Sequence, residues 1–223
     1  MVTYVGFMNW QRARTDEKKN ERKAAIYGAA LTLFKKKGYE KVSFNAIAVE
    51  AGFTKSNMYR YFCSKEEIFL NIFASLFDDW YEDCSQRLQK LDENVEVTLF
   101  AKTWVASYKS HPEFLDLIPI LFISLENNSS FEQLLEFKKL SMNLLYQLAV
   151  KVSKIYPTIQ DEKAFQFLTL SFAATANYWA AQSQQNEALE KIYQLEQFKV
   201  LKPNFEQSLT VSVEIIIKGL QAS

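Results

Sequence analysis

The 223-residue sequence contains few of the residues that interrupt helices or build covalent frameworks. It has 5 glycines, 4 prolines and 2 cysteines. Because glycine and proline mark turns, their scarcity argues against a protein made of many short strands. Two cysteines, Cys63 and Cys84, cannot form the disulfide framework of a small secreted domain, and the first ten residues lack the pattern of a signal peptide. We therefore expect a protein of the reducing cytoplasm.

The sequence also lacks the motifs of common enzymes. No GxSxG, P-loop, HExxH or cysteine cluster is present. The only histidine, His111, cannot form a metal site by itself, and we expect it at a helix end before Pro112. We therefore predict no catalytic activity, no metal and no bound cofactor.

A membrane span is also disfavoured. The stretch 164–186 carries no charge over 23 residues, which is long enough to cross a bilayer. However, it contains many Gln, Asn, Ser and Thr residues, which are unfavourable in lipid. A buried helix in a helical bundle is the better interpretation, and we expect no membrane partner.

Long segments with helical periodicity dominate what remains. Hydrophobic residues make up 48% of the chain, including 18 phenylalanines, so a large core is possible. These features predict an all-α fold with a head over residues 15–65 and a larger helical body over residues 66–223. The first helix is expected from about Asp16 to Lys37, with Gly38 ending it.

The segment 43–65 reads as two short helices joined by a glycine turn. Ser43 and Thr54 are suitable N-caps, and Gly52 suits the turn because glycine readily adopts a positive φ. Met58 and Phe62 give the second helix a buried edge, which leaves polar residues on its outer side. This arrangement is typical of a helix-turn-helix, which places its second helix in the DNA major groove.

The charge distribution agrees with that interpretation. The chain is neutral, with 26 basic and 26 acidic residues. Residues 1–65 hold 13 Lys/Arg and 5 Asp/Glu, a net of +8, and residues 66–223 hold 13 and 21, a net of −8. A basic head suits contact with phosphate. The alternative is a solvated surface, in which Lys35, Lys36 and Lys37 are the exposed end of a helix.

The chain resembles the tetracycline-repressor (TetR) family of bacterial regulators. The resemblance rests on Ala51-Gly52, the run Met58–Phe62 and the helix start at Lys65-Glu66, and it is specific over residues 20–80. It implies a head of that extent, with a helix-turn-helix, and a C-terminal body for ligand binding and homodimerisation. It also implies a repressor that is released from a near-palindromic operator by a small molecule.

The resemblance also assigns DNA contacts by residue. It implies phosphate contacts by Ser43, Thr54, Tyr59, Tyr61 and Lys65, base contacts by Lys55, Ser56 and Asn57, and additional contacts by Phe44 and Arg60. Hydroxyl and ammonium groups suit phosphates, while Lys and Asn suit guanine and adenine edges. Many members have Gly where this chain has Ser56, so base preference does not carry over. For Tyr59 and Tyr61 the alternative is packing, and for Lys65 it is an ordinary helix surface.

Aromatic and polar residues of the body suggest a ligand chamber. The expected binding residues are Trp80, Trp104, Tyr108, Phe122, Met142, Asn143, Tyr146, Phe172, Asn177 and Tyr178. A largely apolar pocket with a few polar groups would bind a small hydrophobic or aromatic effector. The alternative is that the aromatic residues are simply core.

The last two long helices are the expected dimer interface. Alanines at 173, 174, 176, 180 and 181 permit close helix approach, and the final helix has an Ile/Val-rich side that needs a cover. A two-fold dimer would present two recognition helices to the halves of one operator. The competing function is a helical adaptor or a ligand-independent regulator that uses its head for protein contact.

Overall fold

The computed structural model describes the backbone of residues 4–184 and 186–223 and the side chains of residues 18–184 and 186–223. Every regular element in these residues is helical, which confirms the predicted fold class. Within the same residues, no helix is both long and apolar enough to cross a membrane.

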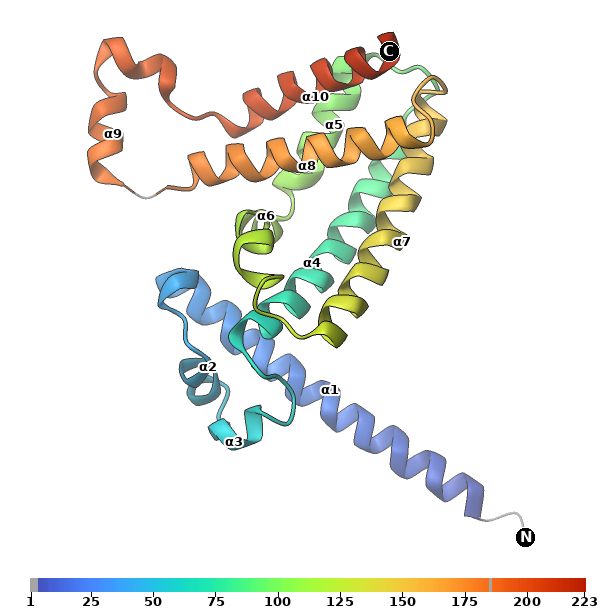
Figure 1. Cartoon of the computed structure of the whole chain (residues 1–223), viewed down its shortest axis with the longest axis vertical. Helices are drawn as coiled ribbons and strands as arrows, with labels where there is room; N and C mark the ends of the chain where they lie inside the picture. The colour runs from blue at the N-terminus through green and yellow to red at the C-terminus, as the bar shows by residue number, and fades with distance from the viewer. Residues whose placement is uncertain (1–3, 185) are drawn as a thin grey trace. The chain divides into compact units, whose positions relative to one another are not determined.

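The chain divides into two compact units. The first contains residues 1–72 and 125–133, and the second contains residues 73–124 and 134–223. The elements of the first unit are α1 (Tyr4–Lys37), η1 (Tyr39–Lys41), α2 (Phe44–Glu50), α3 (Lys55–Met58) and the start of α4 (Lys65–Leu88). Those of the second are the rest of α4, α5 (Val97–Lys109), α6 (Pro112–Leu117), η2 (Ile118–Ile120), η3 (Leu121–Leu125), most of α7 (Phe131–Ile155), α8 (Glu162–Gln182), α9 (Glu187–Tyr193), η4 (Glu196–Leu201) and α10 (Phe205–Ala222) (Figure 1).

Helix α1 is longer than the sequence pattern indicated. It begins at Tyr4 rather than near Asp16, because the intervening residues contain no proline to stop a helix. Its end agrees with expectation, since Gly38 follows Lys37 with φ +75°. A side chain at that position would strain the backbone, so glycine fits the turn.

Helix α4 begins with a modified capping box, in which Ser64 caps the helix and Glu67 reaches back toward the preceding backbone. The Glu67 backbone N–H donates to the Ser64 hydroxyl at 3.1 Å. The Glu67 carboxylate accepts from the backbone N–H of Cys63 at 2.7 Å, not from that of Ser64. It also accepts from the Ser130 N–H at 3.2 Å. The buried carboxylate therefore joins the start of α4 to residues 125–133, which explains why that segment belongs to the first unit.

The second unit is built around a cluster of packed aromatic rings. The Trp80 ring centroid lies 4.6 Å from that of Tyr108, and Trp104 lies 4.9 Å from Phe167. Helices α8 and α10 lie side by side at the C-terminal end of the chain (Figure 1). The side chains of Tyr178 and Ser212 join them by a hydrogen bond of 2.9 Å. Burial of the packed rings of Trp80, Trp104 and Tyr108 stabilises the unit.

Candidate nucleic-acid interface

Two capped helices and a glycine turn form the helix-turn-helix of the first unit. The Ser43 hydroxyl accepts from the Ala46 N–H and caps α2, and the Thr54 hydroxyl accepts from the Asn57 N–H and caps α3, both at 3.2 Å. Gly52 adopts φ +73° between them. The caps satisfy backbone groups that would otherwise lack partners, so each helix starts at a defined residue.

Helix α3 is anchored on one side and open on the other. Met58 is fully buried, as is Phe62 just after the helix. The residues proposed for base contact, Lys55, Ser56 and Asn57, are all exposed. The side chains expected to face DNA therefore lie outward on a helix that the core holds in place.

The neighbouring aromatic residues are partly packed and partly open. The rings of Phe44 and Tyr59 lie 5.1 Å apart, and Lys55 Nζ lies 5.8 Å from the Tyr59 ring centroid. Phe44 is half-buried, whereas 52% of Tyr59 is exposed. Tyr59 thus combines a packing contact with an accessible phenol, and such a hydroxyl suits a phosphate oxygen.

Lys65 is less free than the family pattern implies. Its Nζ donates to the backbone carbonyl of Tyr39 at 3.3 Å and lies 4.2 Å from the Tyr39 ring centroid. A cation above a ring is attracted by the negative π face. In this structure the ammonium group therefore connects α4 to η1, and the side chain is half-buried.

Tyr61 lies beside three basic residues of α1 that the sequence pattern did not single out. Arg22 Nη1 donates to the Tyr61 hydroxyl at 3.0 Å, and this bond raises the pKa of the guanidinium. Lys18, Lys19 and Arg22 line a hollow of about 330 Å³ together with Arg60 and Tyr61. The sequence signal was the basic run within the first helix, but only the fold brings it next to the turn after α3.

The ten residues expected to line a ligand chamber do not surround one interior. Trp80, Trp104 and Tyr108 are buried among other rings. Phe172 and Tyr178 are half-buried, whereas Phe122, Met142, Asn143, Tyr146 and Asn177 are exposed. The expectation of a common interior is therefore corrected.

Helix α7 explains this correction. It carries two apolar sides: Leu144 and Leu148 face the core, while Met142 and Tyr146 face outward. Periodicity identifies both sides of such a helix as apolar, but it does not say which of them meets the other helices.

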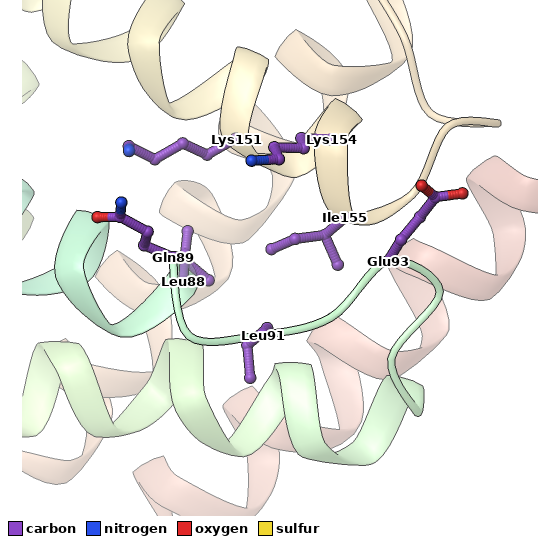
Figure 2. A pocket seen from close by; sticks show the side chains of 7 residues that line it. All are labelled: Leu88, Gln89, Leu91, Glu93, Lys151, Lys154 and Ile155. Carbon is purple, nitrogen blue, oxygen red and sulfur yellow. The ribbon is translucent and has the colours of Figure 1, made fainter.

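An open hollow of about 170 Å³ lies elsewhere in the second unit, where the ends of α4 and α7 meet (Figure 2). Its lining residues are Leu88, Gln89, Leu91, Glu93, Lys151, Lys154 and Ile155. The ammonium groups of Lys151 and Lys154, the carboxylate of Glu93 and the amide of Gln89 lie there beside aliphatic side chains. None of these residues was predicted from the sequence, because no motif marks them.

Two titratable side chains of the second unit, the Cys84 thiol and the Tyr108 phenol, are fully buried. Burial raises the pKa of the Cys84 thiol to about 12, although a hydrogen bond with Ser107 opposes the shift. Burial also raises the pKa of the Tyr108 phenol far above its usual value, against the effect of a hydrogen bond with Thr175. Both groups are therefore neutral at physiological pH, and neither is suited to act as a nucleophile or base. The described residues also contain no group of His, Cys, Asp and Glu able to hold a metal.

The fold and the head together define a class. An all-helical chain presents a capped helix-turn-helix whose second helix has an open polar face. This is the architecture of a helix-turn-helix DNA-binding protein.

Comparison with known proteins identifies the family. Residues 26–72 match the family described as bacterial regulatory proteins, tetR family, and residues 74–223 match the Tetracyclin repressor-like C-terminal domain. The second match covers more than half of the chain. The chain belongs to the TetR family of DNA-binding transcriptional regulators. Proteins of this family are generally not enzymes.

One curated relative and two solved structures agree with this assignment. The uncharacterized HTH-type transcriptional regulator YfiR of Bacillus subtilis is 38% identical over 82 residues, a match that spans only 37% of either protein. A putative TetR-family regulator from Syntrophomonas wolfei has a TM-score of 0.57 at 16% identity, covering 92% of this chain and 97% of its own. A TetR/AcrR-family regulator from Thermobifida fusca has a TM-score of 0.52 at 19% identity, covering 86% and 97%. These structures show the same fold.

Proposed function

We propose that this regulator is a cytoplasmic repressor that binds a near-palindromic operator as a homodimer and is released by a small effector. The observation that carries the proposal is the open face of α3 with Lys55, Ser56 and Asn57, held by the buried Met58. Lysine can donate to guanine O6 and N7, and asparagine pairs with adenine N6 and N7. The excess of positive charge in residues 1–65 supplies the attraction to phosphate.

Selection from random duplexes tests operator binding. The purified protein is mixed with a pool of random double-stranded DNA, and bound sequences are recovered and amplified over several rounds. A repeated sequence with two related halves is the expected product. Their centres are expected about 34–36 Å apart, one helical turn, or slightly more. Recovery of no enriched sequence at low salt contradicts the proposal and favours a head that contacts protein.

The outer surfaces of α8 and α10 support the homodimer. On α10, Val211 and Ile215 are 49% and 65% exposed, and on α8 Leu170 is 50% exposed. Ala173 on α8 is also exposed, and its small side chain permits close approach of a second helix. Apolar side chains on two adjacent helices form a surface that a second copy can cover by two-fold symmetry.

Sedimentation velocity at micromolar concentration tests the dimer. The wild type is expected to sediment as a dimer and Ile215→Glu as a monomer, because the carboxylate would be buried without a partner. Val150→Glu is the matched control, since Val150 is similarly exposed but lies on α7. A wild type that remains monomeric at these concentrations contradicts the proposal.

A buried polar group supports an effector site in the body. Among the described residues, Trp104 Nε1 is buried and has no hydrogen-bond partner, whereas Trp80 Nε1 donates to the Ser107 hydroxyl at 3.1 Å. A buried unpaired N–H is costly, so a ligand with an acceptor atom would relieve it. The surrounding rings favour a hydrophobic or aromatic compound.

Release requires that the effector bind one state of the protein better than the other. Both α4 and residues 125–133 continue along the chain into the second unit, and Glu67 joins them within the first. We infer that an effector acts on the head through α4.

Displacement of the dye Nile red tests effector binding. A compound that displaces Nile red from the wild type and weakens operator binding is the expected finding. Trp104→Phe removes the N–H but keeps an aromatic ring, and it is expected to lower the affinity of the protein for that compound. Operator affinity that is unchanged at saturating concentrations of every displacing compound contradicts release by an effector.

A further inference from the structure

The hollow beside Tyr61, which we call the α1 hollow, is lined by Lys18, Lys19, Arg22, Arg60 and Tyr61. Four of these five residues are cationic and none is acidic. The volume of about 330 Å³ is large enough for an anionic group and its water. Three of the cations come from α1, outside the helix-turn-helix itself.

The charges of the α1 hollow repel one another. Lys18 and Arg22 are four residues apart on α1, and Lys19 and Arg22 are three apart, so both pairs are neighbours on the helix surface. Like charges at this spacing oppose each other in the free protein. A bound anion attracts each of these cations, and this attraction offsets the repulsion among them.

The Tyr61 hydroxyl is oriented by the same group of residues. It accepts a hydrogen bond from Arg22 Nη1 at 3.0 Å, so its own proton remains available to donate. A donor that already accepts from a cation is polarised and donates more strongly. Arg22 therefore acts as a positioning residue for Tyr61 as well as a charge.

The α1 hollow is also fixed relative to α3. The backbone N–H of Arg60 donates to Asn57 O at 3.3 Å, and that of Tyr61 donates to Met58 O at 2.9 Å. The turn that carries both side chains is thus a hydrogen-bonded continuation of α3. Because the sugar-phosphate backbone borders a groove on both sides, it is the part of DNA that a basic hollow next to the end of α3 would meet.

We propose that α1 extends the expected phosphate contact of Tyr61 into a larger site, the α1 hollow, in which Lys18, Lys19 and Arg60 surround a DNA phosphodiester and Tyr61 donates to its oxygen. The site extends the contact with DNA beyond the helix-turn-helix onto α1. The proposal rests on the operator binding proposed above. It assigns α1 a direct part in DNA affinity but none in base selection, because phosphates carry no sequence information.

Charge removal on α1 tests the site. The probe is the duplex enriched by the wild type, and its affinity is measured by fluorescence anisotropy over a series of salt concentrations. Lys18→Gln with Lys19→Gln removes two charges from the α1 hollow. Lys36→Gln with Lys37→Gln removes two charges from the other end of the same helix and is the matched control. Glutamine retains a good helix propensity, so both variants should fold.

The expected result is a smaller salt dependence for the α1-hollow variant only. Its slope of log affinity against log salt should fall by about 1 for each phosphate that the variant no longer neutralises. Preference for the enriched duplex over a scrambled one should remain. In ethylation interference, ethylation of one flanking phosphate should weaken binding by the wild type but not by the α1-hollow variant. Slopes and interference patterns equal to those of the control variant would overturn the proposal.

A double-mutant cycle tests the role of Arg22. If Arg22 positions Tyr61, then Arg22→Gln and Tyr61→Phe together weaken binding by clearly less than the product of their separate effects. Independent effects would show that Arg22 contributes charge alone and would overturn its positioning role. If the wild type binds no enriched duplex, the proposed operator binding fails. If the wild type binds but the two charge variants behave alike, only the α1 hollow proposal fails.

Discussion

The two units of the chain use similar residues for opposite purposes. In the first unit, Tyr59 and Tyr61 keep accessible phenols next to Lys55 and Arg22. In the second, Trp80 and Tyr108 stack with each other and are buried. Charge also differs along the chain, with a net of +8 over residues 1–65 and of −8 over residues 66–223. An aromatic residue therefore indicates a binding surface only when a neighbouring polar group keeps one side of it in water.

The largest expected effect is in the aromatic core of the body. Trp80→Ala should lower the free energy of unfolding by about 3–5 kcal/mol, because it leaves a cavity among packed rings. Tyr146→Ala, at an exposed position on α7, should change it by less than about 0.5 kcal/mol. Urea denaturation followed by circular dichroism measures both. Equal effects would contradict the described division between core and surface.

The next effect concerns the open face of α3. Asn57→Ala should weaken binding to the enriched duplex by about 1–3 kcal/mol while leaving the unfolding free energy nearly unchanged. Asn20→Ala, an exposed amide on α1, is the control and should bind as the wild type does. If Asn57→Ala instead reduced stability and kept its affinity, the side chain would have a structural role only.

A smaller effect is expected at the cap of α3. Thr54→Ala should destabilise the head by about 1 kcal/mol, because the Asn57 N–H loses its acceptor. Thr54→Ser keeps the hydroxyl and should restore most of that stability. Hydrogen exchange of the Asn57 amide measures the change locally. Unchanged exchange in the alanine variant would show that the cap contributes little.

The two cysteines provide the mildest comparison. Cys63 in the head is exposed and should react with a thiol reagent in the native protein, whereas buried Cys84 should react only after unfolding. Because burial raises the folded-state pKa of Cys84 to about 12, its neutral form contributes stability below the unfolded-state pKa. That contribution is lost as pH rises from about 8.5 toward the folded-state pKa. Comparing the unfolding free energies of Cys84→Ser and the wild type over this pH range measures that contribution. If both thiols reacted at the same rate in the native protein, the burial of Cys84 would be contradicted.

The sequence was sufficient for the fold and for most of the local geometry of the head. The caps at Ser43 and Thr54 and the turn at Gly52 depend on residues a few positions apart, and the structure contains each of them. The all-helical class followed from periodicity and from the scarcity of glycine and proline. Local rules suffice where a feature is determined by neighbours in the chain.

Features that depend on distant segments could not be predicted. The contact between Arg22 and Tyr61 joins residues 39 positions apart, and nothing local indicates it. The hydrogen bond from the Ser130 N–H to the Glu67 carboxylate joins residues 63 positions apart, and nothing local indicates it either. In the body, Met142 and Tyr146 had the composition of a pocket lining but lie on the outer side of α7. The choice between two apolar sides of a helix is made by tertiary packing.

Salt titration of DNA binding tests the central claim, that the basic head meets phosphate and α3 reads bases. Affinity is measured for the enriched duplex and for a scrambled duplex of the same length and composition. The expected result is a steep fall with salt for both, with the enriched duplex bound at least about 10³-fold more tightly. Equal affinity for the two duplexes at every salt concentration, or affinity independent of salt, would contradict the account.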